Sequence, residues 1–175
     1  VLFPAYKEDK VIIPAIYSFL QQDYPRELYD IIVISDQMQE STNEALRQLP
    51  VRLLIADYTD SSKAKAMSLA MNATADIPYD AVVIMDADNT AGTSFLSELN
   101  PVFQSGARAV QAHRTAKNTN TDIAVLDAAS EEINNSIFRS GHIALGLSSA
   151  LIGSGMALEA CWFRQHIHLL ETAGG

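Results

Sequence analysis

The sequence predicts an α/β protein with a single, mostly parallel sheet flanked by helices. Short apolar runs alternate with stretches of helical length along the chain, which is typical of parallel strands joined by helices. The run Val82-Val83-Ile84-Met85 is apolar on both faces, as a strand covered on both sides must be. The chain has 175 residues, 48% of them hydrophobic, and no linker or internal repeat divides it, so we expect one domain over residues 1–175.

The first half of the chain alternates three times between strand and helix. Apolar residues recur on one face of 12–22, and Asp23-Tyr24-Pro25 ends that helix because a residue before proline avoids the helical region. Serines begin the next two helices, with Ser41 as the candidate N-cap of one and Ser61 or Ser62 of the other. The elements expected here are a strand at 1–3, a helix at 12–22, a strand at 29–34, a helix at 41–49, a strand at 51–55 and a helix from the serine cap to about 75.

The second half continues the same alternation and carries the polar strand ends. The elements expected here are a strand at 80–86, a helix at 95–104, a strand at 107–114, a helix at 121–139, a strand at 151–158 and a helix at 161–170. Open parallel sheets bind ligands at the carboxyl ends of their strands. We therefore expect the residues that follow the strands to line one edge of the sheet: Tyr6, Lys7, Glu8, Asp36, Asp86 and Asp88.

Composition excludes several classes of protein. A formal net charge of −9 argues against nucleic acid as a partner, because a phosphate backbone needs a basic face. The single cysteine, Cys161, excludes an internal disulfide and a multi-cysteine zinc site, which favours a reducing compartment such as the cytoplasm. No apolar stretch reaches the roughly 20 residues that a membrane-spanning helix needs.

Two carboxylates, Asp86 and Asp88, stand one residue apart where the most apolar strand ends. Burying two like charges costs free energy unless a positive group neutralises them. Carboxylate oxygens are the hard ligands that divalent cations take, and a cation held there can hold a diphosphate. The pair therefore predicts a metal-assisted site for a phosphorylated ligand. The alternative is that an aspartate only caps a helix beginning near Thr93.

The common motifs of other nucleotide-binding and hydrolytic enzymes are absent. Neither G-x-G-x-x-G nor the P-loop G-x-x-x-x-G-K-[ST] occurs, so a dinucleotide dehydrogenase and a P-loop phosphotransferase are not supported. Gly153-Ser154-Gly155 lacks the five-residue frame of a serine hydrolase.

Six short motifs, in order over nearly the whole chain, resemble those of family-two glycosyltransferases. The family has a P-x-Y-N-E-E opening, a Q-x-Y-P turn, a strand ending in aspartate, a K-x-x-A-L segment, a D-x-D strand end and a glycine-containing segment. In this chain the corresponding residues are Pro4-Ala5-Tyr6-Lys7-Glu8-Asp9, Asp23-Tyr24-Pro25, Ile32-Val33-Ile34-Ser35-Asp36, Lys63-Ala64-Lys65-Ala66-Met67, Val83-Ile84-Met85-Asp86-Ala87-Asp88 and Gly153-Ser154-Gly155-Met156-Ala157.

The resemblance implies a GT-A fold, with a Rossmann-like sheet, and an inverting transfer from a nucleoside diphosphate sugar. Asp36 would bind the base or its ribose, and Asp88, with Asp86, would ligate Mg²⁺ or Mn²⁺. The donor is expected to be a UDP-sugar, and the acceptor a saccharide or a lipid-linked molecule in polysaccharide or cell-envelope synthesis. The implied nucleotide-sugar site consists of Ala5, Tyr6, Glu8, Asp36, Lys63, Asp86, Ala87 and Asp88, and the implied sugar and acceptor pocket of Arg114, Gly153 and Ser154.

The chain departs from the family pattern in ways that leave the base and sugar undetermined. Lys7 stands where the family has Asn, and Asp36-Gln37-Met38-Gln39-Glu40-Ser41-Thr42 replaces its D-x-S-x-D-x-T stretch. The family places its catalytic base in an acidic pair that would follow Gly175. We therefore expect the catalytic base beyond this residue, in a longer protein whose other segments could associate with the cytoplasmic face of a membrane.

Two other functions stay open. A sugar-phosphate nucleotidyltransferase also uses acidic metal sites on an α/β sheet, but it would be expected to have a Gly-rich, Arg-containing loop where this chain has Pro4–Asp9. A non-catalytic nucleotide-sugar-binding module would keep the fold without the chemistry.

Overall fold

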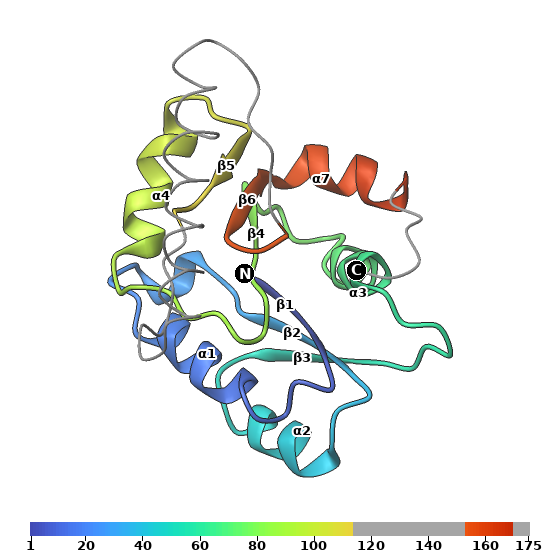
Figure 1. Cartoon of the computed structure of the whole chain (residues 1–175). Helices are drawn as coiled ribbons and strands as arrows, with labels where there is room; N and C mark the ends of the chain where they lie inside the picture. The colour runs from blue at the N-terminus through green and yellow to red at the C-terminus, as the bar shows by residue number, and fades with distance from the viewer. Residues whose placement is uncertain (114–152, 170–175) are drawn as a thin grey trace, which may run out of the picture.

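The computed structural model describes residues 1–113 and 153–169, which form one twisted sheet covered by helices on both faces (Figure 1). Its six strands lie in the order β3-β2-β1-β4-β6-β5. The strands are β1 (Leu2–Tyr6), β2 (Ile32–Asp36), β3 (Arg52–Ala56), β4 (Ala81–Ile84), β5 (Ala109–Gln111) and β6 (Met156–Glu159). The helices are α1 (Ile12–Leu20), α2 (Glu40–Arg47), α3 (Lys63–Ala73), α4 (Phe95–Gln104) and α7 (Ala160–His166), with short 3₁₀ turns η1 (Arg26–Leu28) and η3 (Ile167–Leu169).

The α/β fold with a mostly parallel sheet is confirmed. Strand β1 pairs in parallel with β2 and β4, and β2 pairs in parallel with β3. Strand β6 enters between β4 and β5 and runs antiparallel to both. The residue pattern did not predict the antiparallel entry of β6, because apolar alternation carries no information about strand direction.

Successive residues of the central strands contribute their side chains to two separate hydrophobic cores, since side chains alternate between the faces of a sheet. Leu2 packs with α3 and α7 on one face, whereas Phe3 packs with α1 and α4 on the other. Figure 1 shows these two pairs of helices on opposite sides of the sheet. On that second face Phe3 meets Phe19 edge to face, with ring centroids 5.3 Å apart. Both cores are fully buried, so the central strands, and the residues at their ends, are held rigidly.

Several expected element bounds need correction. Strand β1 continues through Pro4 to Tyr6, where a loop was expected, because its pairing with β2 holds this segment extended. Ser41 is not the N-cap of α2, which begins one residue earlier after Gln39. The helix expected at 121–139 lies outside the described residues. Within the described residues, none of the helices has the length and apolarity that crossing a bilayer requires.

Asp9 joins the two loops that follow β1 and β2. Its Oδ1 accepts hydrogen bonds from the backbone N–H of Gln39 at 2.8 Å and from the hydroxyl of Thr42 at 2.7 Å. Gln39 is the N-cap of α2 and provides no side-chain cap of its own, so Asp9 caps this helix from another loop. The bond from Thr42, followed by that from Gln39, lowers the pKa of Asp9 below its ordinary value of 3.8.

Replacing Asp9 by alanine is expected to lower the free energy of unfolding near pH 7 by about 1 kcal/mol, as the loss of a helix cap usually does. Because the folded protein lowers the pKa of Asp9, this contribution is complete above its ordinary value of 3.8 and disappears as the pH falls through the lower, folded value. Urea unfolding of both proteins near pH 7 and near pH 2 measures the difference. Asp9→Asn keeps an oxygen acceptor and should retain most of the stability near pH 7. Equal unfolding free energies of wild type and Asp9→Ala near pH 7 would contradict the capping role.

Candidate functional site

Three strands end at the same edge of the sheet and bring the expected polar residues together there. Tyr6 and Asp36 are the last residues of neighbouring strands and are partners in the parallel register of β1 and β2. On the other side of β1, the parallel strand β4 leads directly to Asp86 and Asp88. The expectation that these residues share one edge is therefore confirmed, and β1 lies between the two groups.

Asp36 is buried at this edge, with only 3% of its surface exposed. Its Oδ1 is fully buried, and no described group donates a hydrogen bond to it. The neighbouring buried polar groups are satisfied, because the Ser35 hydroxyl donates to the Asn43 amide oxygen at 2.7 Å. A buried carboxylate oxygen without a donor is costly. Asp36 is thus ready to accept a hydrogen bond from a ligand N–H or O–H.

Tyr6 lies next to Asp36 and is 47% exposed. Its hydroxyl donates to Gln37 Oε1 at 3.4 Å, and the Lys7 ammonium lies 4.8 Å from its ring centre. Lys7 and Gln37, which follow the two strands, both adopt positive φ, 56° and 53° respectively. These matched turns end β1 and β2 at the same level. They leave an exposed aromatic ring beside a buried acid, an arrangement suited to stacking and hydrogen bonding with a nucleobase.

Residues 86–89 form a tight turn after β4, which we call the Asp turn. The backbone N–H of Asn89 donates to the Asp86 carbonyl at 3.1 Å, and the buried Ala87 side chain lies in the core between the two aspartates. Asp88 is exposed and Asp86 is partly exposed. The N-cap residue of α4 is Ser94, and the backbone N–H of Leu96 in its first turn donates to the Gln22 side-chain oxygen at 3.0 Å.

Lys63 connects the Asp turn to two other parts of the chain. Ser62 caps α3 by accepting a hydrogen bond from Lys65 N at 3.2 Å, so one of the two predicted serine caps is confirmed. This places Lys63 at the first position of the helix. Its ammonium donates hydrogen bonds to Asp86 Oδ1 and to the Gly153 carbonyl.

Ser154 stabilises the Asp turn through two hydrogen bonds. Its side chain is 1% exposed, and its Oγ accepts from the Asp86 backbone N–H at 2.9 Å and from Asn89 Nδ2 at 2.6 Å. The Ser154 carbonyl accepts from Gln111 Nε2 at 2.9 Å. Sequence reasoning missed Asn89 and Gln111. Asn89 adjoins the motif and could have been noticed, whereas Gln111 is recruited only by the pairing of β5 with β6.

Four expected site residues remain. Ala5 is buried in the sheet. Glu8 is exposed, and its carbonyl accepts the first backbone hydrogen bonds of α1. Gly153 is exposed and lies against the Lys63 ammonium. Arg114 lies outside the described residues.

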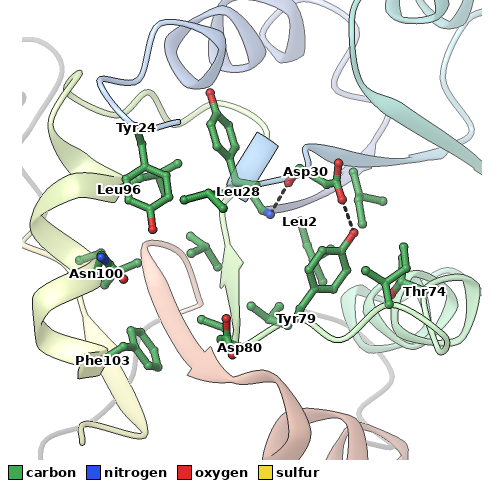
Figure 2. Close-up of a pocket in the computed structure, with 18 of the residues that line it drawn as sticks. Leu2, Tyr24, Leu28, Asp30, Thr74, Tyr79, Asp80, Leu96, Asn100 and Phe103 are labelled. Carbon is green, nitrogen blue, oxygen red and sulfur yellow. Dashed lines mark hydrogen bonds between the residues drawn. The ribbon is translucent and has the colours of Figure 1, made fainter. Parts of the chain in front are cut away.

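A cavity of about 410 Å³ lies at the opposite edge, where β1, β2 and β4 begin (Figure 2). It lies between α4 and the end of α3, and in it the Tyr79 hydroxyl donates to Asp30 Oδ2 at 2.5 Å. Burial, followed by this hydrogen bond, raises the pKa of Tyr79. None of the expected site residues lines the cavity. Because open α/β sheets bind ligands at their carboxyl edge, the candidate site remains at the ends of β1, β2 and β4.

The six-stranded, mostly parallel sheet with polar strand ends gathered at its carboxyl edge is an α/β fold of the kind that binds ligands at that edge, and the solved structures that it resembles are GT-A glycosyltransferases. The model of the family described as glycosyltransferase like family 2 matches residues 1–164, and the chain belongs to this family. The resemblance stated from its motifs is therefore confirmed.

Solved structures share the fold at low sequence identity. S. aureus TarS, residues 1–349, in complex with UDP-GlcNAc is 13% identical, with a TM-score of 0.69 over 94% of this chain and 46% of that chain. The mannosyltransferase PcManGT from Pyrobaculum calidifontis, in complex with GDP-Man and Mn²⁺, is 18% identical, with a TM-score of 0.67 over 94% of this chain and 45% of that chain. The chain thus spans slightly less than half of each of these proteins.

One curated relative matches a shorter part of this chain than the solved structures do. The probable glycosyltransferase YdaM of Bacillus subtilis (strain 168) is 26% identical over 95 residues, which are 51% of this chain and 22% of the relative.

Proposed function

We propose that this chain is the nucleotide-sugar-binding domain of an inverting, metal-dependent glycosyltransferase. The observation that carries the proposal is the shared edge at which exposed Tyr6, buried Asp36 and the Asp turn meet, in a chain of glycosyltransferase family 2. The sugar would pass from a nucleoside diphosphate sugar to a saccharide or lipid-linked acceptor, in polysaccharide or cell-envelope synthesis. The proposed location is the cytoplasm or the cytoplasmic face of a membrane.

The geometry suggests an order for the parts of the donor along this edge. Tyr6 and Asp36 would hold the base and ribose, with Ala5 and Glu8 forming the rest of that pocket. Lys63 and the Asp turn would face the diphosphate on the other side of β1. The sugar and acceptor would then lie towards Gly153 and Ser154, together with Arg114. A UDP-sugar is the proposed donor, supported by the TarS complexes, although the PcManGT complex contains GDP-Man.

The donor set at the Asp turn fits Mg²⁺ or Mn²⁺. Asp86 and Asp88 offer carboxylate oxygens at a partly exposed position, and these are the ligands that such ions take. No group of three or more His, Cys, Asp or Glu side chains suited to a metal occurs in residues 1–113 and 153–169. The remaining ligands would therefore come from the diphosphate and water, which is how proteins commonly hold Mg²⁺. When bound, the cation supplies Lewis-acid stabilisation of the charge on the departing nucleoside diphosphate.

Transfer also requires a general base within reach of the acceptor hydroxyl, and such groups contribute typically about 10²–10⁴-fold to a rate. We propose that the residues assigned to the donor site do not supply this base. The residues described here would then bind and orient the donor rather than deprotonate the acceptor.

A thermal-shift panel tests the proposal. UDP, GDP, ADP and CDP would each be added with and without Mn²⁺, together with Mn²⁺ alone. One diphosphate, expected to be UDP, should raise the apparent stability only in the presence of the metal, by about 2.7 kcal/mol at a ligand concentration one hundred times its Kd. Failure of every diphosphate to raise the unfolding temperature, with or without Mn²⁺, would overturn the proposed function. A sugar-transfer assay on a version extended past Gly175 separates an enzyme from a non-catalytic binding module.

A further inference from the structure

Lys63 is unusual for its position in the fold. It is the first residue of α3, where the backbone dipoles leave a partial positive charge that disfavours a cation, and the first turn of this helix contains no acidic residue. Its side chain is only 26% exposed. The ammonium therefore depends on acceptors from elsewhere in the chain, and the two that it finds are Asp86 Oδ1 and the Gly153 carbonyl.

The Gly153 backbone lies close to the Lys63 ammonium. A Cβ built at Gly153 would lie 3.4 Å from Lys63 Nζ, which is van der Waals contact. An ammonium has three N–H donors, and Asp86 and Gly153 take two of them. One donor remains for a ligand oxygen on this side of the Asp turn.

The Asp86 carboxylate is thus a binding partner for two cations, the Lys63 ammonium and the proposed divalent ion. Asp86 is one of the two acids proposed to ligate the divalent ion, and its carboxylate is also the ion-pair partner of Lys63. Two cations at one carboxylate repel each other strongly at separations of a few ångströms. The affinity of Asp86 for a divalent ion is therefore low while the Lys63 ammonium is paired with it, and rises when a ligand offers the ammonium another acceptor.

We propose that Lys63 is the resident counter-ion of the Asp turn, which keeps the affinity for the divalent cation low until a nucleoside diphosphate is bound. The diphosphate oxygens accept from Lys63, Asp86 becomes available to the cation, and metal and nucleotide binding are thereby coupled. By linkage, the cation raises the affinity for the nucleotide by the same factor. This inference rests on the proposed function and adds to it a reason why the two ligands bind together.

Manganese titrations test the coupling without any transfer assay. The electron paramagnetic resonance signal of free Mn²⁺ gives the affinity of the nucleotide-free protein, and the titration is repeated with saturating UDP. Lys63→Met removes the ammonium and should raise the Mn²⁺ affinity of the nucleotide-free protein about tenfold, since a repelling charge beside Asp86 has gone. The further increase caused by UDP should be smaller in this variant than in wild type.

Two variants serve as controls. Lys65→Met removes an ammonium from the same helical turn, but that ammonium is bonded to the Asp60 carbonyl, so its Mn²⁺ affinity should stay near that of wild type. Lys63→Arg keeps the charge and should restore the low affinity of the nucleotide-free protein. Circular dichroism and thermal unfolding establish that each variant is folded, and a Lys63→Met protein that fails to fold is replaced by Lys63→Gln.

The outcomes are distinguishable. If wild type binds UDP with Mn²⁺ but Lys63→Met binds Mn²⁺ no more tightly than wild type, Lys63 does not compete and only this inference is overturned. Weaker Mn²⁺ binding by Lys63→Met would overturn it too, because Lys63 would then assist the metal. If no protein binds Mn²⁺ at all, both the inference and the metal part of the proposed function are wrong. If Lys63→Met binds Mn²⁺ more tightly but no diphosphate binds, the competition stands and the proposed function fails.

Discussion

Replacing Asp88 by alanine is expected to abolish Mn²⁺-dependent nucleotide binding while the protein remains folded. Asp88 is exposed in the Asp turn beside Asp86, and its carboxylate oxygens are ligands that a divalent ion takes. Removing one of two nearby like charges relieves repulsion, which favours the folded, metal-free protein. Isothermal titration with UDP, with and without Mn²⁺, measures the effect.

Asp76→Ala is the matched control for this prediction. It removes an exposed carboxylate from the segment before β4, at the other end of the sheet, and should leave Mn²⁺-dependent binding unchanged. Retention of the full Mn²⁺ effect by the Asp88→Ala protein would exclude Asp88 as a metal ligand.

Replacing Asp36 by alanine is expected to weaken nucleotide binding without destabilising the protein. Loss of one hydrogen bond to a charged group costs roughly 1.5–3 kcal/mol, which is about one to two decades in affinity. Because Asp36 Oδ1 is buried and accepts no hydrogen bond from any described group, its removal also relieves a desolvation cost. Titration calorimetry with uridine and with UDP measures binding, and urea unfolding measures stability.

The neighbouring buried residue Asn43 provides the contrast. Asn43 accepts a hydrogen bond from Ser35, so Asn43→Ala leaves a buried hydroxyl unpaired and should cost about 1–3 kcal/mol of stability. If Asp36→Ala weakens the binding of UDP but not that of uridine, Asp36 acts at the diphosphate and the proposed order of the pocket is wrong. A loss of stability as large as that of Asn43→Ala would show that Asp36 supports the fold instead.

Local signals in the sequence predicted most of the elements and the edge that they form. The helix at 95–104 has the expected bounds, and Ser62 caps α3 as one of two predicted serines. The wrong predictions concern positions whose structure depends on residues far away in the sequence. Pro4 suggested a loop, but pairing with β2 extends the strand past it. Ser41 suggested a cap, but Asp9 supplies one from a loop 30 positions earlier than Gln39.

The carboxylates of the site could be named from their place after apolar strands, but their supports could not. Lys63 and Asp86 are 23 positions apart in the sequence, and Ser154 and Asn89 are 65 positions apart, so apolar alternation specifies neither contact. The same reason explains why Asp36 could be named but its unpaired, buried oxygen could not: burial of a strand end depends on the loops that close over it.

The Ser154 contact also determines when, during synthesis, the Asp turn can become ordered. The chain must close a loop of 68 positions before Ser154 reaches the Asp86 backbone, and β6 must insert between β4 and β5. Strands β1 to β3 need only nearby crossovers, so they can pair while the chain is still emerging from the ribosome. A nascent chain that has not yet exposed Ser154 therefore carries both aspartates on an unsupported turn. The Asp turn therefore gains its Ser154 hydrogen bonds only in a chain whose sheet is already complete.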